Sequence, residues 1–358
     1  MVDLCLLEEI PRDAFGKAHE VLSQRYPADH SADSEDNRED TPEDDREPPE
    51  FYHRQDYDLA VARVDPAQHA GVRDSLLQSF SPAAVTLGAL QRLPLEIIFE
   101  ICAYSDIASV FALRHVNRRF SQIVSQVRPY QVLVLHALDT LCILLRSELA
   151  QHFTLQDLVE VLYTENCSFC GSFGGFIFLP TLSRCCFPCV GTPRPVGREL
   201  RVIDHARLSE LLPEVMKSIS VPVMKTLPGV YTTNALGQEQ STRLSSMAAV
   251  LKAVGPQHLF TITCTEQMYM ARCTAMAAMP FVHKTTGAVE YGVSCNGCLS
   301  ELEVPGQERM QRIRNVAAMA YSQEGFLRHS EECKRDRFLR SLPPSFYALL
   351  LHGVRSLG

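Results

Sequence analysis

The amino-acid sequence predicts a mainly α-helical protein with short β elements, of the α+β class. Apolar residues recur at helical spacing between residues 90 and 163. Short runs of β-branched and aromatic residues follow later in the chain, beside two sets of cysteine and histidine residues with the spacing of metal ligands. With 358 residues, of which 46% are hydrophobic and 21% charged, the chain is long enough for two or three globular domains.

The N-terminal part is predicted to form three segments. Residues 1–27 have weak helical periodicity and would form a short arm. Residues 28–50 hold eleven Asp/Glu and two Arg, a net charge of −9, and almost no aliphatic side chains, so we expect them to be disordered. Because the whole chain has a net charge of −8, the remainder is close to neutral, and the acidity says little about the partners of the folded part. Residues 51–88 are a mixed connector.

Residues 89–130 are predicted to form three short helices. Pro94 suits the first turn of a helix, and Ser105 and Asp106 offer a helix stop and a new N-cap. The apolar residues recur at helical spacing in three sets, which are Ile97, Ile98, Ile101 and Cys102, then Ile107, Val110, Phe111 and Leu113, then Val116, Phe120, Ile123, Val124 and Val127. A unit of about forty residues is too small to bury all these side chains by itself. We therefore expect something outside the unit to cover part of them.

The same residues resemble an F-box. The family pattern is a Leu-Pro start, an acidic residue with two aliphatic residues, a break, and then a helix with the pattern Val-(Asn or Cys)-Arg-x-(Phe or Trp). The matching residues are Leu93-Pro94, Glu96-Ile97-Ile98, Val116-Asn117 and Arg118-Arg119-Phe120. The resemblance implies a substrate receptor that docks on the Skp-type adaptor of a cullin-RING ubiquitin ligase. Carried over residue by residue, it implies adaptor contacts at Leu93, Pro94, Ile97, Ile98, Leu113, Val116 and Phe120. Ordinary core helices of an unrelated domain are the alternative interpretation of the apolar pattern alone.

The region after residue 130 also resembles the large group of fungal F-box proteins with cysteine-rich C-terminal regions. A helix is predicted at about 131–150, and another from Thr154 to about Tyr163, where Thr154 and Asp157 have the spacing of a capping box. Further helices are expected at Ala206–Ile219, Thr242–Val254, Met268–Met279 and Arg309–Tyr321, and short strands at Phe176–Leu179, Val230–Thr233 and Phe260–Thr263. The apolar stretch from Val132 to Leu145 is too short to span a bilayer.

Four cysteines between residues 167 and 189 have the spacing of a zinc site. The two CxxC pairs, separated by fifteen residues, are Cys167 with Cys170 and Cys186 with Cys189. Two such loops are the usual way to place four thiolates tetrahedrally around Zn²⁺. Gly171 suits the tight turn because glycine tolerates positive φ. Cys185 could replace Cys186 as a ligand, and buried free cysteines are the alternative to a metal site.

A second set of candidate metal ligands lies closer to the C-terminus. It consists of the CxxC pair Cys295 and Cys298 and, thirty residues further on, His329 and Cys333. His329 and Cys333 are four residues apart and would share one face of a helix. This is the pattern of a Zn²⁺ site with three cysteines and one histidine, although a lone exposed CxxC and a surface histidine are the alternative. Neither set has a spare acidic ligand or an open position, so both zinc sites should be structural.

Other classes of function have weaker support. The chain has no HExxH, GxSxG, GxxxxGK[ST] or GxGxxG motif, and Cys264 and Cys273 fit core thiols, so we expect a non-catalytic subunit whose partners transfer the ubiquitin. The eight ligands do not fit a RING-type module, because 105 residues (190–294) separate the two sets. A zinc-ribbon protein that binds nucleic acid is the alternative function. Residues 309–340 hold eight basic and four acidic residues, but the pI of the whole chain is 5.9.

The sequence thus predicts an F-box at 89–130, followed by a zinc-braced C-terminal region at 131–358 that would bind a protein target. Zinc site one would lie at 167–189 and zinc site two at 295–333. The N-terminus, MVDLCLLEEI, has acidic residues where a secretory signal needs basic ones. The thirteen cysteines fit metal ligands and free thiols better than a disulfide framework. We expect a protein of the cytoplasm, the nucleus or both, without a membrane partner.

Overall fold

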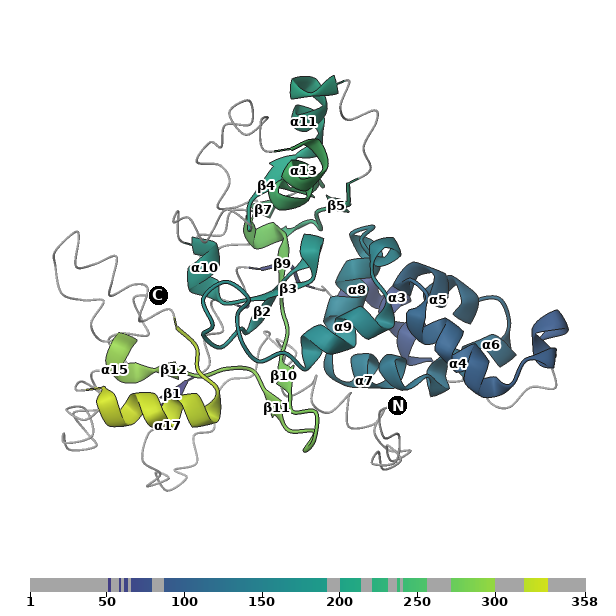
Figure 1. The fold of residues 1–358 in the computed structure, drawn as a ribbon, viewed down its shortest axis with the longest axis horizontal. Helices are drawn as coiled ribbons and strands as arrows, with labels where there is room; N and C mark the ends of the chain where they lie inside the picture. The colour runs from purple at the N-terminus through teal and green to yellow at the C-terminus, as the bar shows by residue number, and fades with distance from the viewer. Residues whose placement is uncertain are drawn as a thin grey trace, which may run out of the picture.

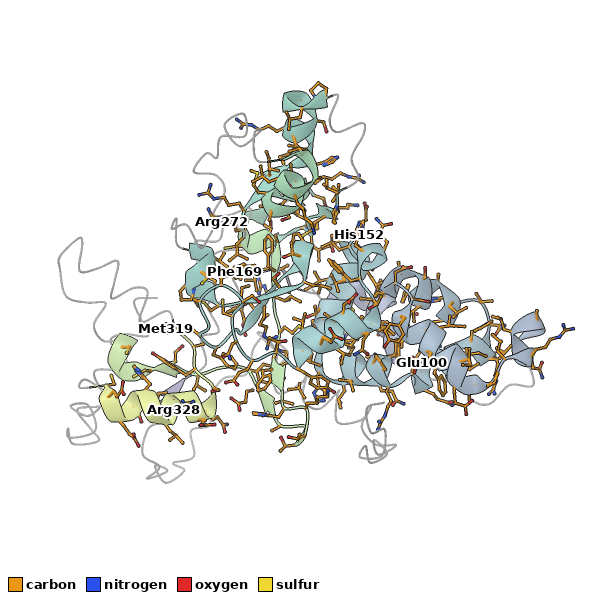
Figure 2. All side chains as sticks on the ribbon, in the orientation of Figure 1. Glu100, His152, Phe169, Arg272, Met319 and Arg328 are labelled. Atoms are coloured by element: carbon orange, nitrogen blue, oxygen red, sulfur yellow. The ribbon has the colours of Figure 1, made fainter. Side chains whose placement is uncertain are left out.

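The computed structural model describes residues 51–52, 58, 61–63, 66–78, 87–191, 200–213, 221–230, 237–238, 241–255, 272–299 and 319–333. Figure 1 shows a group of helices at one end, drawn in blue, and small sheets in the centre. The helix α17 (Gln323–Glu332), drawn in yellow, lies at the opposite end. Glu100, Phe169 and Arg328 mark these three places in Figure 2. The described part of the chain is mainly helical with short strands, which confirms the predicted fold class.

The three helices predicted for residues 89–130 are present. A short 3₁₀ turn, η1 (Gly88–Arg92), leads into α4 (Leu95–Tyr104), α5 (Ile107–Arg114) and α6 (Arg118–Gln126). Asp106 caps α5 by accepting a hydrogen bond from the N–H of Ser109, and Asn117 caps α6 in the same way from Phe120. Each cap satisfies an N–H that would otherwise lack a partner, and this explains why the chain turns at these residues.

The helix predicted at 131–150 is in fact two helices. They are α7 (Arg128–His136) and α8 (Leu138–Arg146), bent by 100° to one another. The bend lets Leu133 of α7 and Leu141 of α8 enter the same core. After the 3₁₀ turn η2 (Ala150–His152), α9 (Leu155–Leu162) begins at the predicted capping box of Thr154 and Asp157. Among the described residues no single helix is long and apolar enough to cross a membrane; α7 and α8 meet that criterion only as a bent pair.

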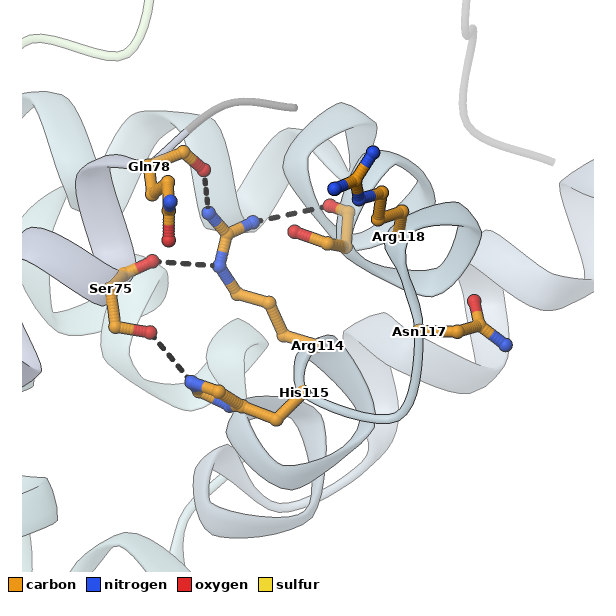
Figure 3. A pocket seen from close by; sticks show the side chains of 7 residues that line it. Ser75, Gln78, Arg114, His115, Asn117 and Arg118 are labelled. Carbon is orange, nitrogen blue, oxygen red and sulfur yellow. Dashed lines mark hydrogen bonds between the residues drawn. The ribbon is translucent and has the colours of Figure 1, made fainter. Parts of the chain in front are cut away.

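A helix that precedes the three-helix unit is joined to it by hydrogen bonds. This helix, α3 (Pro66–Leu77), lies beside α8. The buried guanidinium of Arg114 donates to the carbonyl oxygens of Ser75 and Gln78, as Figure 3 shows, with an N···O distance of 3.0 Å to Ser75. It also donates to the carbonyl of Ser121 at 3.1 Å. The hydroxyl of Tyr130 donates to the carbonyl of Leu76 at 2.7 Å. Part of the predicted connector is therefore built into the helical unit.

A three-stranded antiparallel sheet lies at the centre of the molecule. Its order is β3-β2-β9, with β2 at Phe176–Phe178, as predicted, β3 at Ser183–Cys185 and β9 at Met276–Ala278. A 3₁₀ turn, η3 (Leu179–Thr181), joins β2 to β3. The prediction of a helix over Met268–Met279 is wrong for β9, because pairing with β2 overrides the helix propensity of its Met and Ala residues.

A second three-stranded sheet, of order β4-β8-β5, is covered by two helices. The strands are β4 (Val202–Asp204), β5 (Val223–Lys225) and β8 (Arg243–Ser246), and the helices are α11 (His205–Leu211) and α13 (Met247–Val254). The helix predicted at Thr242–Val254 therefore begins later, because Arg243–Ser246 pair with both neighbouring strands and Ser246 then caps α13. The first half of the helix predicted at Ala206–Ile219 is α11, and residues 214–220 lie outside the described part.

The remaining described elements are short. They are α10 (Phe187–Gly191), β6 (Gly229–Val230) paired with β7 (Gly237–Gln238), β10 (Phe281–Val282) paired with β11 (Val289–Glu290), β1 (Phe51–Tyr52) paired with β12 (Ser294–Cys295), α15 (Asn296–Leu299) and α17 (Gln323–Glu332). Several predictions lie outside the described residues, among them the arm at 1–27, the acidic segment at 28–50, the strand at 260–263, Cys264, and most of the helix at 309–321. The basic stretch 309–340 is described only for residues 319–333.

The hydrogen bond between Tyr130 and α3 can be tested directly. Burial raises the pKa of Tyr130 to about 12, so its hydroxyl remains a donor at neutral pH. We expect Tyr130→Phe to lower the free energy of unfolding by about 1–3 kcal/mol, because the Leu76 carbonyl loses its partner. Chemical denaturation measures this. Tyr163→Phe is the matched control and should change the free energy of unfolding by less than about 0.5 kcal/mol. If both substitutions lowered it equally, a stabilising hydrogen bond between Tyr130 and α3 would be contradicted.

Candidate functional site

Helix α4 has apolar residues on two adjacent sides, about 100° apart around the helix axis. Ile98 and Cys102 are buried in the main core, whereas Ile97 and Ile101 are 47% and 49% exposed. Residues four apart lie on the same face of a helix, so each pair forms its own apolar stripe. The outer side of a helix on a protein surface is normally polar. The outer stripe of α4 therefore needs an explanation outside the core of this chain.

The exposed apolar residues gather around this helix. Six of the seven exposed large hydrophobic residues in the described part of the chain lie between residues 90 and 116, and the seventh is Leu327. We call the six the apolar face; they are Leu90, Leu93, Ile97, Ile101, Tyr104 and Val116. Single exposed hydrophobic residues are common on soluble proteins, but a gathering of this kind is typical of a binding surface.

The seven residues predicted to contact an adaptor fall into three groups. Leu93, Pro94, Ile97 and Val116 are exposed, and Leu113 is half-buried. Ile98 and Phe120 are only 3% and 5% exposed, because this chain covers them itself. Adaptor contact at all seven residues stays a prediction.

The apolar face also includes Leu90, Ile101 and Tyr104, which the family pattern did not single out. A signal for two of them was present in the sequence, because Ile101 and Tyr104 lie four and seven residues after Ile97 on the same helical face.

The inner side of the three-helix unit is covered by the helices that follow it. Helix α4 packs against α9 and α7. The N–H of Ile107, the first residue of α5, donates to the carbonyl of Phe153 at 2.9 Å, and Asp106 pairs with Thr154 in an isolated bridge. The unit is thus fused to the rest of the protein on one side. Its other side, with the apolar face, is left to solvent.

The first cysteine cluster consists of Cys167, Cys170, Cys186 and Cys189, whose four sulfur atoms lie within 4.8 Å of one another. The Sγ atoms of Cys167 and Cys189 are 3.8 Å apart, and those of Cys170 and Cys186 are 3.5 Å apart. The pairing of β2 with β3 brings the two CxxC loops together. Gly171 has φ +76°, as the predicted tight turn requires, and its N–H bonds to the carbonyl of Cys167.

The sulfur atoms of the first cluster influence one another strongly. Hydrogen bonds between Cys167 and the thiols of Cys186 and Cys189 lower the pKa of Cys167 to about 2. The pKa of Cys186 is raised, because its proton is shared with Cys167. Four thiolates at these distances need a cation between them, because like charges so close together repel strongly.

The structure distinguishes Cys186 from its neighbour Cys185. Cys186 belongs to the cluster, whereas Cys185 is fully buried in β3 and is not among the four converging residues. Cys185 is the last residue of β3, whereas Cys186 lies directly after the strand and before α10. Burial raises the pKa of Cys185 well above its ordinary value, so it is a neutral core thiol.

The second cluster consists of Cys295, Cys298, His329 and Cys333, whose ligand atoms also lie within 4.8 Å of one another. The CxxC pair spans the end of β12 and α15, while His329 lies on α17 and Cys333 caps its C-terminus. The Sγ of Cys298 is 3.3 Å from Nε2 of His329 and 3.9 Å from Sγ of Cys333. The ring of Tyr321 stacks on the imidazole of His329, with centroids 4.4 Å apart, and so limits its rotation.

Both clusters have the donor types and spacing that a tetrahedral metal ion requires. Zn–S bonds of about 2.3 Å place the sulfurs of a tetrahedral site about 3.8 Å apart, and Zn–N bonds of about 2.0 Å bring a nitrogen slightly closer. The measured S···S distances are 3.5–3.9 Å and the S···N distance is 3.3 Å. Both predicted ligand sets are therefore brought together, and each could hold a metal ion.

Comparison with known proteins identifies the helical unit. The family model of the F-box domain matches residues 90–132. The chain matches no curated protein and no solved structure. The protein therefore contains an F-box domain, formed by α4, α5 and α6 with the start of α7, and the match supports an adaptor-binding role in a ubiquitin ligase for this segment. The resemblance of the C-terminal region to fungal F-box proteins stays a prediction.

The assignment of Cys186 rather than Cys185 to the first cluster predicts a difference in metal content. We expect two zinc ions per parent chain, one in Cys186→Ala, and two in Cys185→Ala, because only Cys186 converges with the other three sulfurs. Elemental analysis of the purified proteins measures this. The assignment would be contradicted if Cys185→Ala lost one zinc ion, or if neither variant lost one.

Proposed function

We propose that this protein is an F-box substrate receptor. Its F-box docks on a Skp-type adaptor of a cullin-RING ubiquitin ligase, and its C-terminal region recruits a protein target. The single observation behind this proposal is the position of the apolar face. It lies on the F-box, around the side of α4 that the chain leaves exposed, while the adjacent side with Ile98 and Cys102 is buried in the core.

Burial of aliphatic side chains supplies the binding energy of this docking. Removing apolar surface from water stabilises a complex by roughly 25 cal/mol per Å². Ile97, Ile101 and Val116 are about half or more exposed, so they have surface to bury. They are held by a helical unit that is already folded and fused to α7 and α9, so docking orders little of the chain. The partner surface should be an apolar groove that accepts one side of a helix.

The two metal clusters have a structural part in this proposal, with Zn²⁺ at each. All four positions of each tetrahedron are occupied by protein ligands, which is the arrangement of structural rather than catalytic zinc. The first cluster fixes the β2-β3 hairpin against α10, and the second joins β12 and α15 to α17. Zinc thereby joins segments that are distant in sequence, and in this proposal these segments present the surface for the target.

The proposed division of labour leaves the chemistry to other subunits. The receptor positions a target, and the partners of the adaptor transfer ubiquitin to it. The described cysteines are free, which suits a reducing compartment such as the cytoplasm or nucleus.

Substitution of the apolar face tests the proposal. The double variant Ile97→Asp with Val116→Asp should bind the purified adaptor at least about 100-fold more weakly, because it loses apolar burial and places two charges in the interface. Titration calorimetry with the adaptor measures the affinity. Both positions are exposed, so the fold should be unchanged by circular dichroism.

Leu327→Asp is the matched control. Leu327 is 63% exposed, as Val116 is, but lies on α17 at the opposite end of the molecule. This control should bind the adaptor as tightly as the parent. The receptor proposal would be contradicted if the double variant bound the adaptor as tightly as the parent. It would also be contradicted if the control lost as much affinity as the double variant.

A further inference from the structure

A cavity of about 310 Å³ lies where α3 meets the turn between α5 and α6. Its size is at the lower end of the range for small-molecule sites in proteins. The described lining residues are all polar, and none of them is acidic. Apart from the cap of α6 they are Ser75 and Gln78 from α3, Arg114 and His115 from the end of α5, and Arg118 and Ser121 from α6. The lining therefore points to an anion as the ligand.

Arg114 supplies a buried positive charge at this cavity. It is 4% exposed, and its guanidinium donates to the carbonyl oxygens of Ser75 and Gln78, as Figure 3 shows, and to that of Ser121. These carbonyls satisfy its N–H groups but leave its net charge in place. In the part of the chain that the structure describes, no Asp or Glu forms an ion pair with Arg114. Buried cations usually have a counter-charge, so this one favours an anion in the cavity.

Arg118, the first residue of α6, adds a second positive charge. It is exposed, and no hydrogen bond or ion pair to another described residue holds its guanidinium. Figure 3 shows Arg114 between Arg118 on α6 and Ser75 on α3. A guanidinium with no other engagement can turn toward a ligand, and its fork of N–H groups matches the oxygens of a phosphate.

Neutral polar groups complete the lining. The imidazole of His115 is fixed by two contacts, with Nδ1 2.7 Å from the carbonyl oxygen of Phe111 and Nε2 2.6 Å from Oγ of Ser75. Because a carbonyl can only accept, Nδ1 carries a proton. The hydroxyl of Ser121 is buried and has no hydrogen-bond partner among the described residues. Buried hydroxyls are normally paired, so this one is a donor still to be satisfied. The cavity thus combines two cations with polar groups from three helices.

We propose that this cavity binds a phosphate monoester, with Arg114 and Arg118 as the residues that recognise its charge. A phosphate group carries nearly two negative charges at neutral pH and three acceptor oxygens, so it can use donors from several helices at once. The volume corresponds to about ten water molecules, which is more than a bare phosphate needs, and the remainder accommodates the group that carries the phosphate. The inference is independent of adaptor docking, because no residue of the apolar face lines the cavity.

Titration calorimetry of the full-length protein and of two variants tests the proposal. Arg118→Gln removes the exposed charge at the cavity. Arg119→Gln is the matched control, because Arg119 is the next residue of the same helix but does not line the cavity. Neither side chain is buried, so both variants should fold like the parent by circular dichroism. Arg114 is left in place, because its hydrogen bonds join α3 to the helical unit.

The probes are glycerol 3-phosphate, a blocked phosphoserine tripeptide, the same peptide without phosphate, inorganic phosphate and acetate. The parent should bind at least one of the two monoesters with a Kd below about 1 mM, and should bind inorganic phosphate, acetate and the unphosphorylated peptide more weakly. The tighter of the two monoesters identifies the source, either a small phosphorylated molecule or a phosphorylated side chain. Arg118→Gln should weaken this binding by about 10- to 100-fold, because a charge-assisted hydrogen bond is lost, and Arg119→Gln should leave it unchanged.

Three results would overturn the proposal. The first is a parent protein that binds neither monoester. The second is an equal loss of affinity in Arg118→Gln and Arg119→Gln, because this indicates attraction to the net charge of α6 rather than a site. The third is acetate or inorganic phosphate binding as tightly as the monoesters, because a site of that kind does not recognise the group that carries the phosphate. None of these results bears on the affinity for the adaptor, which is measured separately.

Discussion

Helix α4 is apolar on two sides, and the polypeptide covers only one of them. Ile98 and Cys102 face a continuous core that extends through α7, α8 and α9, whereas Ile97, Ile101 and Tyr104 face solvent. A unit of about forty residues cannot bury all of these side chains by itself. The later helices cover only the side with Ile98 and Cys102 and leave the other side exposed. The exposed side is the basis for the proposed receptor function, because a second protein can cover what the chain itself leaves exposed.

The rest of the molecule depends on a different constraint, which is the scarcity of regular structure outside the helical core. Sheets of two or three short strands are only marginally stable alone. Two ligand clusters compensate by joining segments that are distant in sequence, and the pairing of β1 with β12 brings residues near 51 to the second cluster. Metal binding and folding should therefore be coupled in this region.

Local signals in the sequence predicted much of the fold. The caps at Asp106 and Thr154 are side-chain hydrogen bonds over three residues, and the CxxC loops are fixed by their own spacing, so neither depends on distant contacts. The failures lie where tertiary pairing decides. Met276–Ala278 form a strand because β2 is beside them. Likewise, periodicity identified Ile97 and Ile98 as apolar positions of α4, but could not tell which of them the later helices would cover.

Amide hydrogen exchange with and without the adaptor tests the central claim most directly, because it locates the covered surface on the intact protein. The account predicts slower exchange in residues 90–116 when the purified adaptor is added, with no comparable change in α9, which is already packed on the inner side of the unit. Adaptor binding that protects another part of the chain and leaves 90–116 unaffected would contradict it.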